Sequence, residues 1–278
     1  MAIGARILPR PDRIATPATG GLALFRAATG LVLVALASYV MFDGVAAANR
    51  ETRPAIAVQA LPFDSLANAQ LASRMQINPE APDDRARARI HGATALMRDP
   101  THAQAARAIG FVALEDADVA AATRAMTYAH WLTRRDLAAE LWLIEYNVTR
   151  GDTRGALAHF DAALSSSTEI HATLFPVMAG AISDDRLIEP MADLLIKQRW
   201  WLPWALRHFA DGPPPPKPDS PAPDAERMRR NAVNAAALFS RIAAGGVRFQ
   251  PETLDALAAR LPADRPDLRR SVQSLPRQ

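Results

Sequence analysis

Histidine is the side chain in this sequence best suited to bind a transition metal, so its spacing is the first test for a metal site. In a helical zinc site, two histidines four residues apart share one face. No pair of histidines here has this spacing, and His159 and Asp161, which flank Phe160, point to different sides of a helix. We therefore predict no metal site. The six histidines are His91, His102, His130, His159, His171 and His208.

Two glutamates beside aromatic residues are the next candidates for chemistry. Glu140 and Glu145 lie near Trp142 and Tyr146, and a pair of carboxylates beside aromatic rings can hydrolyse a sugar bond. At a spacing of five residues the two side chains diverge around a helix, so we expect ordinary surface charges. The sequence also lacks a phosphate-binding glycine loop, a nucleophile elbow and a dinucleotide fingerprint. It therefore predicts neither an enzyme nor a bound cofactor.

The elements that carry these residues are predicted to be helices. Apolar residues make up 49% of the chain and aromatics only 6%, because alanine supplies much of the apolar share. Alanine has the highest helix propensity, so the composition favours an all-α fold. The absence of cysteine excludes disulfides and cysteine nucleophiles. The net charge is only +3, and no basic stripe interleaved with aromatics indicates nucleic-acid binding.

Residues 21–42 form an apolar run that is long enough to cross a membrane. Because more basic residues precede the run than follow it, we predict a cytoplasmic tail over 1–20 and one transmembrane helix over 21–42. A linker over 43–62 then leads to the rest of the chain, in the periplasm at a bacterial inner membrane. A cleaved signal peptide, ending at the small residues 46–48, and a buried helix are the alternatives.

A repeat with a period of 34 residues organises the middle of the chain. The windows 103–136 and 137–170 align without gaps, and the window 69–102 carries the same alanines at 88 and 95. In this alignment small residues match small ones and large apolar residues match large ones: Ala122 aligns with Ala156, Met126 with Phe160, and Ala129 with Ala163. Two helices cross closely only where the side chain is small, so we expect these alanines at helix–helix contacts.

This pattern resembles the tetratricopeptide repeat, a helix-turn-helix unit of 34 residues. Gly110 matches the small residue of the family's eighth position, whereas Ile144 replaces it in the next unit, and the family's tryptophan at position four is missing. The resemblance implies a right-handed α-solenoid over 63–210 with a concave groove. The run 141–164 is also similar to uncharacterised repeat proteins of Alphaproteobacteria, some of which are linked with exopolysaccharide assembly.

The first helix of each unit would line this groove. Family members that bind a C-terminal carboxylate place lysine and asparagine there, and this sequence lacks that basic set. The candidate partner-binding residues at the corresponding positions are Gln104, Arg107, Phe111, Leu114, Leu141 and Glu145.

The tripeptide Arg150-Gly151-Asp152 falls between the two helices of the second unit. Gly151 can adopt the left-handed conformation that ends a helix, and Asp152 or Thr153 can cap the next one. We therefore predict a tight turn and not a cell-adhesion motif.

The C-terminal third is predicted to continue as helices. Residues 171–196 show the spacing of a further helix pair, and a candidate aromatic patch follows, composed of Trp200, Trp201 and Trp204. These rings either plug the end of the solenoid or bind a carbohydrate or partner. A proline-rich linker over 211–224 precedes a C-terminal helical segment over 225–278, with helices at 225–246 and 251–261 and frayed residues from Pro266.

These features together predict a membrane-anchored periplasmic scaffold that holds another envelope protein or protein complex. The similarity noted above suggests exopolysaccharide assembly or export as its setting. The alternative is an envelope enzyme that acts on polysaccharide or peptidoglycan, with Glu140, Glu145 or Asp161 as acids.

Overall fold

The computed structural model describes residues 19–213 and 224–278, and over these residues the regular structure is helical, with one isolated bridge between Phe249 and Arg277. The prediction of an all-α protein is confirmed. The helices are α1 (Thr19–Asn49), α2 (Pro54–Ala60), α3 (Ser65–Ile77), α4 (Asp84–Arg98), α5 (Ala103–Glu115), α6 (Val119–Leu132), α7 (Leu137–Thr149), α8 (Thr153–Ser166), α9 (His171–Ala181), η1 (Asp185–Leu187), α10 (Ile188–Leu195), α11 (Leu202–Asp211), α12 (Ala225–Ala244), α13 (Pro251–Arg260) and α14 (Pro266–Gln273).

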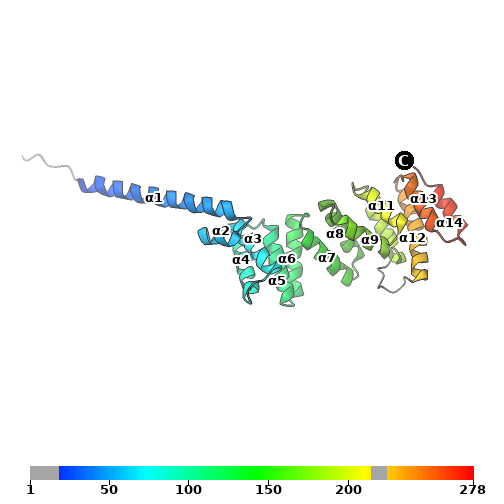
Figure 1. Ribbon diagram of the computed structural model, residues 1–278, viewed down its shortest axis with the longest axis horizontal. Helices are drawn as coiled ribbons and strands as arrows, with labels where there is room; N and C mark the ends of the chain where they lie inside the picture. Colours follow the sequence, from blue (N-terminus) through cyan, green and yellow to red (C-terminus); the bar gives the residue numbers. More distant parts are fainter. Residues whose placement is uncertain (1–18, 214–223) are drawn as a thin grey trace, which may run out of the picture.

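Helix α1 projects from one end of the molecule (Figure 1). Its segment Ala28–Asn49 has a mean hydropathy of 2.0, and apolar side chains from Leu31 to Val45 are exposed. This helix is long and apolar enough to be a membrane span or a signal sequence. The predicted tail over 1–20 lies, up to residue 18, outside the described residues.

The end of α1 packs against the helices that follow it. Ala46 is buried with Ala57 of α2 and Ala67 of α3, and Arg50 donates to the carboxylates of Asp43 and Asp64 at 3.3 and 2.6 Å. The prediction of a linker over 43–62 is therefore wrong, because the alanine-rich end of α1 stays helical where it finds a packing partner and α2 follows within four residues.

Three consecutive helix pairs, α3–α4, α5–α6 and α7–α8, follow one another along the long axis (Figure 1). The first residues of α7 and α8 lie 34 positions after those of α5 and α6. The alanines predicted at helix crossings are all buried, which confirms them: Ala88, Ala95, Ala122, Ala129, Ala156 and Ala163.

Gly110 shows how tight these crossings are. A Cβ atom at this position would lie 3.0 Å from the Met126 side chain, so the glycine lets α5 approach α6. Residues one repeat apart also meet: Gln104 Nε2 donates to Gln70 Oε1 at 3.1 Å, and Arg107 donates to Ser73 Oγ at 3.0 Å. The repeat register is thus reflected in contacts between successive first helices.

The turn predicted at residues 150–152 is confirmed. Gly151 has φ 72°, and the Asp152 carboxylate accepts a hydrogen bond of 2.9 Å from the backbone N–H of Gly155 at the start of α8. Ala117 occupies the same place one repeat earlier with φ 60°, a conformation that costs more for alanine than for glycine.

One hydrophobic core joins α7–α8 to all the helices from α9 to α14. Its largest buried side chains include Phe175, Trp201, Phe209, Phe239 and Phe249. The segment 225–278, predicted as a C-terminal helical segment, therefore shares its core with the helices that precede it. Most of the predicted linker over 211–224, namely residues 214–223, lies outside the described part of the chain.

The helices predicted at 171–196, 225–246 and 251–261 are confirmed as α9–α10, α12 and α13. The frayed end predicted from Pro266 is wrong. Helix α14 buries Val272, and Gln278 donates its backbone N–H to Phe249 O at 3.0 Å, so the last residues are held by the turn before α13.

Arg260 links the helices on both sides of residues 214–223. Its guanidinium donates to Phe209 O at 2.8 Å and Ala210 O at 2.7 Å on α11, and to Asn231 Oδ1 at 2.7 Å on α12. Burial lowers the pKa of Arg260 below its ordinary value, but an arginine stays charged at neutral pH. These three acceptors replace the water that the buried charge has lost.

Candidate functional site

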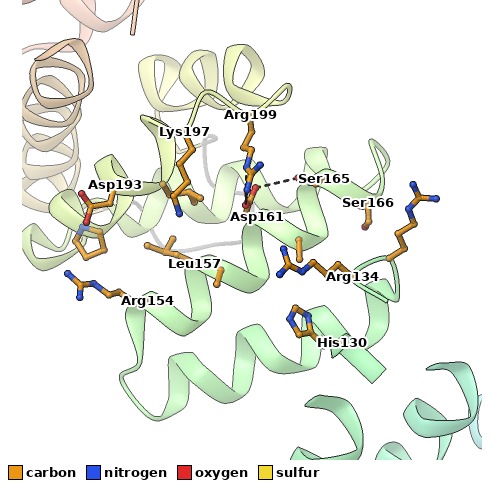
Figure 2. Close-up of a pocket in the computed structure, with 15 residues that line it drawn as sticks. His130, Arg134, Arg154, Leu157, Asp161, Ser165, Ser166, Asp193, Lys197 and Arg199 are labelled. Atoms are coloured by element: carbon orange, nitrogen blue, oxygen red, sulfur yellow. Dashed lines mark hydrogen bonds and ion pairs between the residues drawn. The ribbon is translucent and has the colours of Figure 1, made fainter. Parts of the chain in front are cut away.

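A cavity of about 630 Å³ lies between the end of α6, one face of α8, and α10 with the loop that follows it (Figure 2). Its wall combines polar and apolar surface in about equal parts and is strongly basic. The lining residues are His130, Arg134, Arg135, Arg154, Leu157, Ala158, Asp161, Ala162, Ser165, Ser166, Pro190, Asp193, Leu194, Lys197 and Arg199.

Most of the positive charge in this basic cavity is unpaired. Arg199 binds Asp161 at 2.9 Å, but Arg134, Arg135, Arg154 and Lys197 have no acidic partner among the described residues. Asp193 is the one other acidic residue of the wall. The cavity therefore has an excess of positive charge, which attracts an anionic ligand.

The local sequence explains how these cations come together. Arg134 and Arg135 follow Thr133, the residue at the C-terminal end of α6, and Lys197 follows the end of α10, where a cation interacts favourably with the helix dipole. Arg154 lies in the first turn of α8, where the dipole disfavours a cation. This position lowers the stability of α8, but it places a further positive charge in the wall of the cavity.

Beside the cavity, three helices bring together His130, Glu140 and His159. His130 Nδ1 lies 2.5 Å from one Glu140 oxygen, and His159 Nδ1 lies 2.7 Å from the other. Glu140 is fully buried, whereas the side chains of His130 and His159 are 25% and 15% exposed. The two rings meet edge to face, with centroids 4.7 Å apart. We call these three residues the His-Glu-His cluster.

The expectation that Glu140 is an ordinary surface charge is therefore wrong. Glu140 is the fourth residue of α7, and α7 lies between α6 and α8, so the first turn of α7 faces both neighbours. His130, in the last turn of α6, and His159, in the middle of α8, supply the polar hydrogens that a buried carboxylate requires. Glu145, one turn later, is exposed as predicted.

Most of the residues predicted for a partner-binding groove are engaged in contacts within the protein. Gln104 and Arg107 form the contacts with α3 described above, and Arg107 also reaches Asp136 at 3.4 Å. Phe111, Leu114 and Leu141 are half-buried against the hydrophobic core. None of the six predicted residues lines the basic cavity.

The aromatic patch is only partly at the surface. Trp200 and Trp204 are 49% and 53% exposed, and their rings meet edge to face at 5.9 Å. Trp201 is fully buried, packs on Phe175 and places Nε1 3.3 Å from Ser165 Oγ, so its assignment to a surface patch is wrong. Trp201 is the ring that fills the core, as the alternative interpretation of the cluster expects.

Sequence reasoning missed both the basic cavity and the His-Glu-His cluster. The spacing rule for histidines considers one helix, whereas this cluster uses three. The repeat alignment could have predicted the burial of Glu140. Position four of each unit is buried in all three windows, where it is occupied by Ala72, Ala106 and Glu140. A carboxylate at that position must find polar partners on the helices beside it.

No family model, no curated protein and no solved structure matches this chain.

Proposed function

We propose that this protein is a membrane-anchored helical-repeat scaffold that holds another envelope protein through an acidic segment of that partner. In this proposal the helix pairs stack as a right-handed solenoid of the tetratricopeptide type. The observation that carries the proposal is the basic cavity, in which Arg134, Arg135, Arg154 and Lys197 have no acidic partner in the described chain. Guanidinium groups bind carboxylates in strong, charge-assisted hydrogen bonds.

The shape of the cavity supports a short peptide segment as the ligand. A volume of about 630 Å³ suits a few side chains, and the cations lie on different elements around it, which suits several carboxylates in succession. A positively charged site of this kind also steers an acidic partner toward the surface before contact.

The joint between α1 and the next helices supports an uncleaved anchor. A signal peptide would be cleaved next to the small residues at 46–48. These residues lie inside α1, and Ala46 belongs to the core that α1 forms with α2 and α3. Cleavage there would remove a buried residue and the Asp43 carboxylate that binds Arg50. An apolar helix that remains attached at this position requires lipid around its exposed side chains.

The anchor and its orientation predict the behaviour of a fusion protein. We expect a phosphatase that is active only in the periplasm to be active when fused after residue 60, and the fusion to stay in the membrane fraction after alkaline washing. A Leu33→Arg, Leu36→Arg pair within the span should release it to the soluble fraction, because each buried charge costs about 2.5–3.5 kcal/mol at the bilayer centre. An inactive phosphatase would show that the orientation is the reverse of the one proposed. A wild-type fusion shortened by about 46 residues would show that the apolar segment is a cleaved signal and not an anchor.

The acidic-peptide proposal predicts a specific effect of charge reversal in the basic cavity. The full chain in detergent should bind a fluorescent hexaglutamate peptide with an affinity that falls as salt rises. The triple change Arg134→Glu, Arg154→Glu, Lys197→Glu should weaken this binding by about tenfold or more, since three attractive contacts become repulsive. Fluorescence anisotropy measures both quantities.

A matched triple variant separates this effect from net charge. Arg227→Glu, Arg230→Glu, Arg270→Glu alters three exposed arginines that do not line the cavity, and it should leave peptide affinity nearly unchanged. Equal weakening by both triple variants, or no binding by the wild type, would rule out an acidic segment as the occupant. Preferential binding of an oligouronate over the peptide would show that the ligand of the cavity is an anionic polysaccharide and not a protein.

The alternative function, an envelope enzyme that acts on polysaccharide or peptidoglycan, requires available carboxylates. Glu140 is buried between two histidines and Asp161 forms an ion pair with Arg199, which leaves exposed Glu145 without a second available carboxylate among the three candidate acids. We rank this function second for that reason. The similarity of the run 141–164 to proteins linked with exopolysaccharide assembly leads us to propose export or assembly of such a polymer as the setting of the scaffold.

A further inference from the structure

The buried carboxylate of Glu140 is the least expected group in the protein. A buried carboxylate is costly unless a cation or several hydrogen-bond donors compensate its charge. Among the described residues its partners are the two imidazoles of His130 and His159, and no arginine, lysine or backbone N–H joins them. This environment is different from that of the other buried acids, Asp64 and Asp84, which accept backbone N–H groups and pair with arginines.

The His-Glu-His cluster has the donor atoms and the convergence of a metal site. One ligand atom from each of its three residues lies within 4.8 Å of the other two. Both histidines present the same nitrogen, Nδ1, to the carboxylate, each to a different oxygen, and their rings meet at 75°. The three side chains come from α6, α7 and α8, which fixes their relative positions by helix packing.

We propose that His130, Glu140 and His159 form a binding site for a zinc-class divalent ion, with Nδ1 of each histidine and a carboxylate oxygen as ligands. Two imidazoles and one carboxylate are a known ligand set for Zn²⁺ sites that leave a fourth position for water or another ligand. Imidazole also selects zinc and similar transition metals over Ca²⁺ and Mg²⁺, which prefer oxygen ligands only. The ion would supply the positive charge that Glu140 lacks.

The metal-bound geometry requires a small movement of the two histidines. Tetrahedral ligands at zinc distances place N and O about 3.3 Å apart. The present separations are 2.5 Å from His130 to one carboxylate oxygen and 2.7 Å from His159 to the other, so the ring next to the oxygen that binds the ion must withdraw by roughly 0.6–0.8 Å. Both histidines are partly exposed, which leaves room for this movement and gives an ion access from solvent.

Titration of the full chain with zinc tests the site directly. The protein in detergent, stripped with a chelator and dialysed, should bind one equivalent of Zn²⁺ by calorimetry and unfold at a higher temperature when loaded. Cobalt should bind in competition with zinc and give the strong visible absorption of a tetrahedral ion. Glu140→Gln and, separately, His159→Asn should each weaken zinc binding by about tenfold or more, because one of three ligands is lost.

Two control variants keep the result decisive. His130→Asn changes the most exposed ligand, so it should fold even if a change at buried Glu140 does not, and it should still weaken binding. His208→Asn alters a histidine outside the cluster, which binds the backbone oxygen of Trp204, and it should leave zinc affinity unchanged. Absence of one-to-one binding by the wild type, or binding that survives His130→Asn and His159→Asn unchanged, would overturn the proposal and leave the cluster as a hydrogen-bonded link between three helices.

Discussion

Replacement of Trp201 by alanine is expected to lower the free energy of unfolding by about 3–5 kcal/mol. The ring is fully buried between Phe175 on α9 and the Ser165 end of α8, so its removal leaves a large cavity in the core that joins α7–α8 to the C-terminal helices. Chemical denaturation of the full chain in detergent, monitored by helical circular dichroism, measures the loss.

Trp200 provides the matched control, because it is the neighbouring residue and its side chain is 49% exposed. Trp200→Ala should cost about 1 kcal/mol or less, since about half of its surface already contacts water. Equal destabilisation by the two changes would show that Trp201 is not the central core residue that its burial indicates.

The second large effect is expected at Arg260. Arg260→Ala should lower the free energy of unfolding by about 2–4 kcal/mol, because Asn231 Oδ1 and the carbonyls of Phe209 and Ala210 each lose a charged donor. The C-terminal helices should also become more accessible to protease. Limited proteolysis and denaturant unfolding together measure both effects.

Arg260→Lys distinguishes lost hydrogen bonds from lost charge. A lysine keeps the charge, but its compact ammonium lacks the planar fork that reaches three acceptors on two helices, so it should recover only part of the stability. Arg230→Ala, at an exposed position on α12, should change stability by less than about 0.5 kcal/mol. Full recovery by lysine would contradict the geometric role of the guanidinium.

Features set by local chemistry could be predicted from the sequence. The apolar run before residue 49, the buried alanines at 122, 129, 156 and 163, and the turn at Gly151 all depend on residue size, helix propensity or backbone conformation at one position. The repeat register strengthened these predictions, because the same requirement recurs at a fixed interval.

Features that depend on several elements could not be predicted in the same way. Glu140 meets residues 10 positions before it and 19 positions after it, so its environment exists only once three helices have packed. The basic cavity likewise combines the ends of α6 and α10 with α8. The burial of Trp201 beside exposed Trp200 and Trp204 depends on the orientation of α11 on α9, which the sequence pattern around them does not specify.

The packing around Arg50, at the end of α1, limits where a partner can contact the basic cavity. The end of α1 contains packed alanines and paired charges, and only a short turn separates α1 from α2. The helices that follow are therefore held against the end of α1 and are not joined to it by a flexible linker. If α1 spans the membrane, as proposed, this packing keeps the basic cavity at a nearly constant height above the bilayer. A partner embedded in the same membrane would then be selected by how far its acidic segment extends, so that reach, as well as charge, would decide which proteins assemble.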